Sequence, residues 1–324
     1  MTTIHFEERG FGSAGQLRPW SDLKALAIRT TGDGPWATDV FWLFVTKAGA
    51  FELPGPLVGS EQLRVLQERL EGFDNEKVIR AMGSAEERIF RVWHEGADRT
   101  RWHPEKYRAR FRALVQRLGG EPGACEAVFE ELAAAWGESH RRYHNREHLA
   151  ECLEQLEGAD VAELALWFHD AVYHADAPGN EERSAQLLLA ACARLHIAQG
   201  TADAAASLVR ATAHDSTAGE VGPDVALVLD VDLSILGAEV TRFMEYEYAI
   251  EEEFKHVPTF KFRLGRGRFL ASLLARPFLF RTPLFRDRYE TKARAQLTAL
   301  LNSPRYRAFR IARWFRNPFR AKSA

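Results

Sequence analysis

The chain has 324 residues, of which 46% are hydrophobic and 27% are charged, and its net charge is −2. This composition is typical of a soluble globular protein, and the length suits two domains that each bury a core. No apolar run approaches the roughly 20 residues that span a bilayer. The first residues also lack the basic-then-apolar layout of a signal peptide, so we expect neither a transmembrane segment nor secretion.

Residues 1–100 are expected to form a small α+β domain. Short runs rich in β-branched and aromatic residues predict strands at 24–31, 39–47 and 50–54. Apolar spacing and end signals predict helices at 59–72, 75–82 and 85–95.

From about residue 103 the pattern changes to apolar residues at three- and four-residue intervals, which predicts one helix after another. The predicted helices before residue 240 lie at 105–118, 125–138, 146–158, 161–174, 182–197, 201–215 and 225–237. Long helices are expected to follow. We therefore expect an all-α domain over 103–301, followed by a tail at 302–324.

Three widely spaced cysteines, Cys125, Cys152 and Cys192, form no CxxC pair. An odd number without paired spacing favours reduced thiols, and we expect a cytoplasmic location. Their placement also predicts no part in a metal site.

Polar residues interrupt several of the apolar helices. His144 and His148 stand four residues apart, so we expect them on one helix face. The other interruptions are His169 with Asp170, His214 with Asp215, and Asp230 with Asp232. A buried carboxylate or imidazolium costs several kcal/mol unless it is paired or bound to metal. One cation shared by four helices at the centre of a bundle would satisfy all of these groups.

This order of residues resembles the HD-domain superfamily of metal-dependent phosphohydrolases, whose pattern is a His, then a His-Asp doublet, then a distant Asp, all on helices. Here the pattern reads His148, then His169 with Asp170 in FHDAVY, then the segment DVDLSILG at 230–237. The resemblance covers residues 103–300. It implies an all-α HD-type helical bundle that binds one or two divalent metal ions. His169 and Asp170 are then metal ligands, and Asp170 would bridge the ions if there are two.

The segment YHNREH at 143–148 also resembles the HN-x-x-H motif of cyclic-nucleotide phosphodiesterases, which share the superfamily core. That resemblance implies that His144 is a general acid and that His148 is a metal ligand. The family's last ligand lies in an ADLS segment, which matches VDLS here and favours Asp232. Asp230 remains the alternative.

A second-metal ligand and a pair of phosphate-binding arginines are further candidates, each with an alternative interpretation. Some HD proteins hold a second metal through a His between the doublet and the last Asp, which makes His214 a candidate ligand; a plain helix-end His is the other interpretation. Arg141 and Arg142 are candidates to hold phosphate oxygens through forked hydrogen bonds. Neighbours on a helix diverge by about 100°, so we expect at least one of the two to be a surface arginine.

Imidazole and carboxylate ligands with open positions suit Mn, Mg, Fe, Ni or Zn rather than a closed structural zinc site. The expected function is therefore a metal-dependent phosphohydrolase or phosphodiesterase that acts on a nucleotide or another small phosphate ester. The alternative is a non-catalytic, metal-stabilised HD protein that binds nucleic acid or a protein partner. A metal-dependent oxygenase is a third interpretation. The presence of His144 as a general acid beside the metal ligands favours hydrolysis, because a purely structural metal site needs no such acid.

The tail at 302–324 is basic and aromatic. It belongs to a charge division in which residues 261–324 hold 17 Lys and Arg against 2 Asp and Glu, whereas the rest of the chain has a net charge of −17. Such a tail could bind single-stranded nucleic acid or an anionic membrane surface. We favour the alternative that its rings pack on the protein and its arginines pair with the surplus carboxylates.

Overall fold

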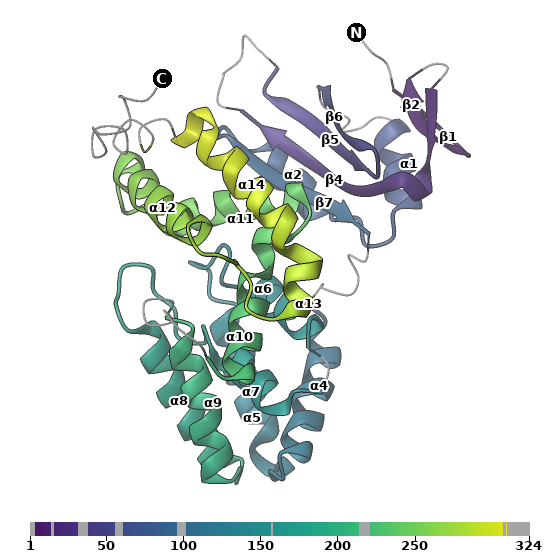
Figure 1. The fold of residues 1–324 in the computed structure, drawn as a ribbon. Coiled ribbons are helices and arrows are strands. Elements are labelled where there is room, and N and C mark those ends of the chain that lie inside the picture. Colours follow the sequence, from purple (N-terminus) through teal and green to yellow (C-terminus); the bar gives the residue numbers. More distant parts are fainter. Residues whose placement is uncertain are drawn as a thin grey trace, which may run out of the picture. The chain divides into compact units, whose positions relative to one another are not determined.

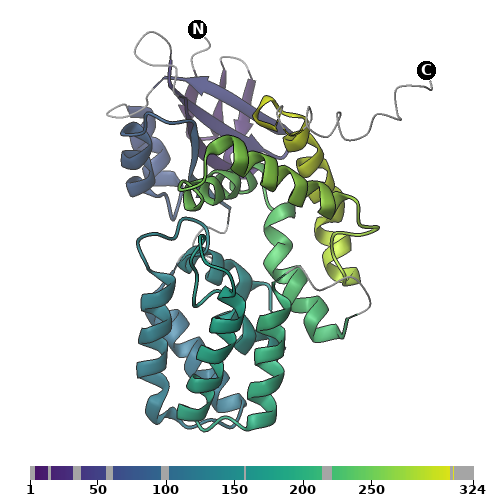
Figure 2. The ribbon, with the colours of Figure 1, turned by 90° about the vertical axis from the view of Figure 1, so that its left-hand side faces the viewer.

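The computed structural model describes residues 4–13, 16–31, 38–55, 61–95, 102–156, 158–213, 221–306 and 309. The chain divides into two compact units (Figure 1, Figure 2). An N-terminal unit comprises Met1–Arg101 with Glu239–Tyr248, and a helical unit comprises Trp102–Ala238 with Ala249–Ala324. The sequence assigned residues 239–248 to the helical domain, but in the structure they cluster with the N-terminal unit. Among the described residues, no helix combines the length and the apolar character needed to cross a membrane.

The N-terminal unit is built on two antiparallel sheets. Its strands are β1 (Ile4–Glu7), β2 (Gly10–Ser13), β3 (Gln16–Pro19), β4 (Leu23–Thr30), β5 (Val40–Thr46), β6 (Gly49–Pro54) and β7 (Arg88–His94). The first three form one sheet in the order β1-β2-β3, and the others form a second in the order β6-β5-β4-β7. The predicted strands β4, β5 and β6 are confirmed, whereas the smaller sheet was not predicted.

Strand β7 corrects the helix that the sequence predicted at 85–95. The strand pairs antiparallel with β4, from Arg88 opposite Thr30 to His94 opposite Ala25. Its partner is about 60 residues away in the chain, so local periodicity gave no sign of the pairing. Packing against a sheet decides strand preference more than an intrinsic backbone preference does.

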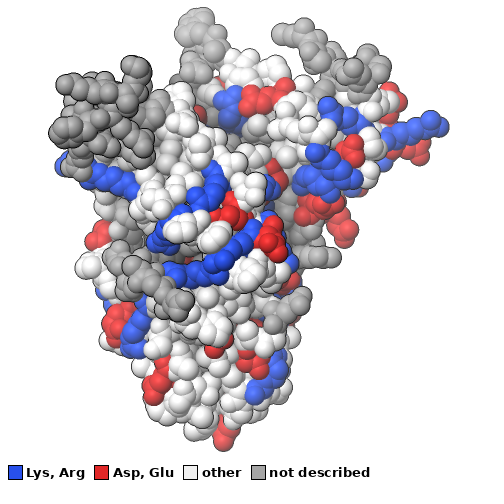
Figure 3. Space-filling model, in the orientation of Figure 1, with Lys and Arg blue, Asp and Glu red and all other residues white. Residues whose placement is uncertain are grey.

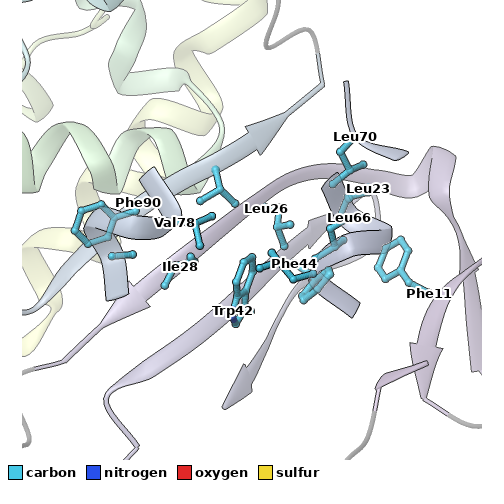
Figure 4. Close-up of a cluster of buried hydrophobic side chains, with 13 residues drawn as sticks. Phe11, Leu23, Leu26, Ile28, Trp42, Phe44, Leu66, Leu70, Val78 and Phe90 are labelled. Atoms are coloured by element: carbon cyan, nitrogen blue, oxygen red, sulfur yellow. The ribbon is translucent and has the colours of Figure 1, made fainter. Parts of the chain in front are cut away.

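The core of this unit lies between the four-stranded sheet and two helices, α1 (Glu61–Arg69) and α2 (Asn75–Met82). Figure 4 shows Leu26 of β4 and Trp42 of β5 packed with Leu66 of α1 and Val78 of α2. Helix α2 begins after Asp74, whose carboxylate accepts a hydrogen bond from the Lys77 backbone N–H at 2.9 Å. This N-cap satisfies one of the donors that a helix start leaves unpaired.

The helical unit contains the elements that position the candidate site. Its helices are α4 (Pro104–Arg117), α5 (Cys125–Trp136), α6 (Arg146–Glu154), α7 (Asp160–Phe168), α8 (Asn180–Arg194), α9 (Gln199–Ala211), α10 (Pro223–Leu233), α12 (Thr259–Leu274), α13 (Pro283–Phe285) and α14 (Thr291–Asn302). A 3₁₀ turn η3 (Ser234–Gly237) follows α10, a π-helical segment η4 (Arg286–Glu290) joins α13 to α14, and a 3₁₀ turn η5 (Pro304–Tyr306) follows α14. Helix α11 (Val240–Glu253) begins in the N-terminal unit and ends in the helical unit.

Helix α7 is the central helix of this unit and packs against α4, α6, α8, α9 and α10. Every residue from Ala162 to Phe168 is buried. The one charged residue among them, Glu163, pairs with Arg110 and Arg117. Trp167 is surrounded by aromatic rings, with its ring centroid 5.1 Å from that of Phe111 and 6.2 Å from that of Phe129. The end of α7 therefore lies inside the core, and the His-Asp doublet that follows begins there.

The start of the C-terminal tail packs on the helical unit. Tyr306 and Phe309 are buried, and a Cβ atom on Gly267 of α12 would lie 2.6 Å from the Phe309 ring. Arg305 pairs with Glu251. Figure 3 shows basic and acidic side chains interspersed on the face that it draws. Arg305, Tyr306 and Phe309 therefore pack and pair with the protein, as we expected for the tail. The remainder of the tail lies outside the described residues.

Candidate metal centre

Helix α6 begins at Arg146, as the sequence predicted, and His144 lies in the turn before it. The Asn145 side chain accepts hydrogen bonds from the backbone N–H groups of Glu147 and His148, at 2.9 and 3.3 Å. Asn145 is thus the N-cap, and the helix begins at Arg146. The expectation that His144 and His148 share a helix face is wrong, because His144 precedes the cap. Their ring centroids are nevertheless 5.9 Å apart.

Three of the predicted ligands converge from three helices. The Nε2 atoms of His148 on α6 and His169 at the end of α7 are 3.2 Å apart. The Asp232 Oδ1 atom, from α10, is 3.4 Å from the first and 3.8 Å from the second. Both imidazoles are buried. Two imidazole nitrogens and a carboxylate oxygen that face one point are suitable ligands for a divalent transition metal.

Cys152 completes this cluster, contrary to the expectation that no cysteine takes part. Its Sγ atom is 3.7 and 3.8 Å from the two ring nitrogens of His148. Donor atoms of His148, Cys152, His169 and Asp232 all lie within 4.8 Å of one another. The spacing of His148 and Cys152, four residues apart on one helix, was the sequence signal that could have identified the thiol.

The protonation of His169 is controlled by its neighbours. Its Nδ1 atom lies 2.8 Å from the Leu166 carbonyl oxygen and donates to it, so that Nε2 faces the cluster. Such an outer hydrogen bond typically orients a metal-binding imidazole. Asp170 Oδ2 is 3.2 Å from His169 Nε2. Burial opposes a charge on His169, but Asp170 and Asp232 outweigh it and raise its pKa to about 9.

The opposite balance holds at His148. Burial lowers its pKa although Asp232 opposes the effect, which favours the neutral ring. The His169 imidazolium holds the pKa of Asp170 below its ordinary value in spite of burial. A divalent cation would take over the role of that proton, so metal binding and protonation compete at His169.

The two aspartates of the DVD segment point in different directions. Residues two apart on an α-helix project about 200° apart. Asp232 therefore faces the cluster, while Asp230 accepts hydrogen bonds from the backbone N–H groups of Arg281 and Thr282, at 2.7 and 2.6 Å. Burial raises the pKa of Asp230 although these two donors oppose it. The geometry favours Asp232 as the ligand and gives Asp230 a structural contact.

His144 is hydrogen-bonded to the carboxylate of Glu253, which the sequence analysis did not identify as a site residue. Its Nδ1 atom is 2.7 Å from Glu253 Oε2, which also accepts a hydrogen bond from the Tyr173 hydroxyl at 2.9 Å. The other oxygen, Oε1, accepts from the backbone N–H groups of Arg142, Tyr143 and His144, at 2.7, 2.8 and 3.0 Å. No pattern separates Glu253 from its acidic neighbours at 251 and 252.

The contact between His144 and Glu253 shifts the pKa of each side chain in the direction that favours its charged form. Burial opposes ionisation of Glu253, but His144 and the backbone donors prevail and lower its pKa to about 2. Burial also opposes a charge on His144, yet Glu253 raises the pKa of the imidazole. The raised pKa favours the protonated form of His144, whose Nδ1 is bound to Glu253.

Of the two arginines before His144, Arg141 is not available as the expected phosphate ligand. The Arg141 side chain is fully buried. It donates to Glu138 and to the carbonyl oxygens of His144, Asp170 and Ala171 at 2.7 to 3.0 Å. These acceptors tie the His144 turn to the segment after α7, so Arg141 has a structural role.

Arg142 is exposed and donates to the Ser139 carbonyl oxygen at 2.6 Å. Of the two arginines, it is the one whose charge can reach a ligand in solution. His214, the candidate for a second metal, lies outside the described residues.

One side of the cluster is partly exposed. The side chains of Asp170, Asp232 and His144 are 14, 15 and 19% exposed, whereas those of His148 and His169 are 2 and 1% exposed. A ligand would reach the cluster from the side on which these three residues lie. The donor set, the buried imidazoles and the oriented His169 ring all suit a bound metal ion.

Comparisons of the chain with models of known protein families, with curated proteins and with solved structures found no match.

Proposed function

We propose that the protein is a metal-dependent phosphohydrolase of the HD type, which acts on a nucleotide or another small phosphate ester. His148, His169 and Asp232 would hold a divalent cation, with Asp170 at its exposed side. When bound, such a cation lowers the pKa of water toward neutrality and polarises a phosphoryl oxygen. The order His148, His169-Asp170, Asp232 along the chain supports the HD interpretation.

The observation that carries the proposal is the placement of His144. Its ring centroid lies 5.9 Å from that of His148, but the ring is outside the donor group and partly exposed. Because Nδ1 is bound to Glu253, Nε2 is the nitrogen that can give a proton to the oxygen of a leaving alcohol. A positioned acid with a raised pKa is what a hydrolytic site requires and a purely structural metal site does not.

A second candidate function rests on Cys152. Closed sites with four protein ligands are typical of structural zinc, and His148, Cys152, His169 and Asp232 supply four. This observation favours a non-catalytic, metal-stabilised protein. It gives the Nε2 atom of the partly exposed His144 ring and the raised pKa of that ring no chemical use, so we rank it second.

Metal analysis combined with a panel of phosphate esters tests the proposal. The purified protein should contain metal and hydrolyse at least one class of phosphomonoester or phosphodiester, and removal of the metal by a chelator should abolish turnover. The matched variant His148→Ala should lose both metal and activity. A protein that binds metal but hydrolyses no ester in a broad panel would support the structural alternative.

A further inference from the structure

The thiol of Cys152 lies in the buried part of the metal cluster. Cys152 lies one turn after His148 on the buried face of α6, together with Leu149 and Leu153. A small core residue such as Ala would also fit between helices. The chemistry of the neighbouring donors decides what a thiol can do there.

The shorter distances in the cluster match those of ligands around one tetrahedral ion, and the others are longer. Zinc lies about 2.0 Å from imidazole nitrogen and about 2.3 Å from sulfur, which places neighbouring ligand atoms roughly 3.3–3.6 Å apart. The distances between donor atoms here are 3.2 Å from His148 to His169, 3.4 Å from His148 to Asp232 and 3.8 Å from His148 to Cys152. Cys152 Sγ also lies 3.7 Å from His148 Nδ1, so the thiol is beside the His148 ring, and the donor atoms of all four residues lie within 4.8 Å of one another. A bound ion would have to draw these donors closer together.

The other cysteines lack such surroundings. Burial alone raises the pKa of the Cys192 thiol to about 11, and neither Cys125 nor Cys192 belongs to the donor group found among the described residues. Cys192 is a core residue with an inert thiol. This contrast makes it a matched control for Cys152.

We propose that Cys152 is a metal ligand and that its sulfur makes the site select a thiophilic ion such as Zn²⁺ over Mg²⁺. Thiolate ligands favour zinc and other soft or borderline metals, whereas carboxylate and water ligands favour magnesium. His148, Cys152, His169 and Asp232 would hold such an ion, and the more exposed Asp170 and His144 would lie beside it. The inference rests on the metal cluster of the proposed function and adds the identity of its ion.

Cobalt substitution tests the ligand directly. The Co²⁺-loaded wild-type protein should show the near-ultraviolet charge-transfer absorption of a thiolate–cobalt bond, and Cys192→Ser should retain it. Cys152→Ser should lose that absorption. Its Zn²⁺ affinity should fall by more than about 100-fold, since loss of a mere outer partner of a metal ligand already costs 10- to 100-fold. Mg²⁺ affinity should stay within a few-fold of wild type.

Two further measurements keep the outcomes distinct. X-ray absorption of the zinc-loaded wild-type protein needs no variant and should show a sulfur neighbour at about 2.3 Å. A shell of nitrogen and oxygen alone, or unchanged zinc affinity in Cys152→Ser, overturns the inference. If Cys152 proves not to be a ligand but His148→Ala still loses the metal, the metal cluster of the proposed function is retained without Cys152. If His148→Ala keeps the metal, the proposed function fails as well.

Discussion

Replacing Glu253 by glutamine removes one charge from the centre of the His144 turn. The carboxylate is nearly fully buried and accepts hydrogen bonds from three backbone N–H groups, from Tyr173 and from His144. Its pKa falls from 4.5 to about 2. At about 1.4 kcal/mol for each pH unit, Glu253→Gln should lower the free energy of unfolding by about 3 kcal/mol near pH 6.

The pH dependence gives this prediction its sign. Because the pKa of Glu253 is lowered in the folded state, its contribution is complete above pH 4.5 and is lost as the pH falls toward about 2. Because the pKa of His144 is raised, its contribution is complete below pH 6.5 and is lost as the pH rises through the raised value. The difference between wild type and variant should therefore be largest between pH 4.5 and 6.5.

Urea unfolding at pH 3, 5.5 and 9 measures this difference. Glu252→Gln is the matched control. The ion pairs of Glu252, at 3.5 and 3.8 Å, are looser, so its loss should cost less than about 1 kcal/mol. A difference for Glu253→Gln that stays below 1 kcal/mol at pH 5.5, or that is equal at all three pH values, would refute the reasoning.

Three other predictions concern the ligands, the acid and the tail. Asp232→Ala should abolish metal binding. Asp230→Ala should keep the metal and lose about 2–4 kcal/mol of stability, because two partly buried N–H groups lose their acceptor. Metal loss in a folded Asp230→Ala protein would reverse the assignment. His144→Ala should keep the metal but lower kcat by roughly 10²- to 10⁴-fold, less for a p-nitrophenyl ester, and an equal loss for good and poor leaving groups would remove His144 as the acid. Deletion of 302–324 should lower the melting temperature because Tyr306 is buried; a stable truncation that loses a salt-sensitive affinity for oligonucleotides would instead indicate a nucleic-acid tail.

The sequence by itself predicted the change from a β-containing N-terminal region to a helical remainder, because amphipathic periodicity is a local property. It also placed His148, His169 and Asp232 at the core-facing ends or faces of apolar helices, since a polar residue inside an apolar run is visible without any fold. The energetic cost of burying such groups was the physical basis for expecting them to meet.

Tertiary structure decided the rest. Only the packing of α10 shows which aspartate of DVD faces the cluster and which holds residues 281 and 282. Only the fold brings Glu253, more than a hundred residues away in the chain, under His144, and pairs β7 with β4. A carboxylate in a run of glutamates and a strand with a distant partner have no local signal, because their roles depend on contacts made across the chain.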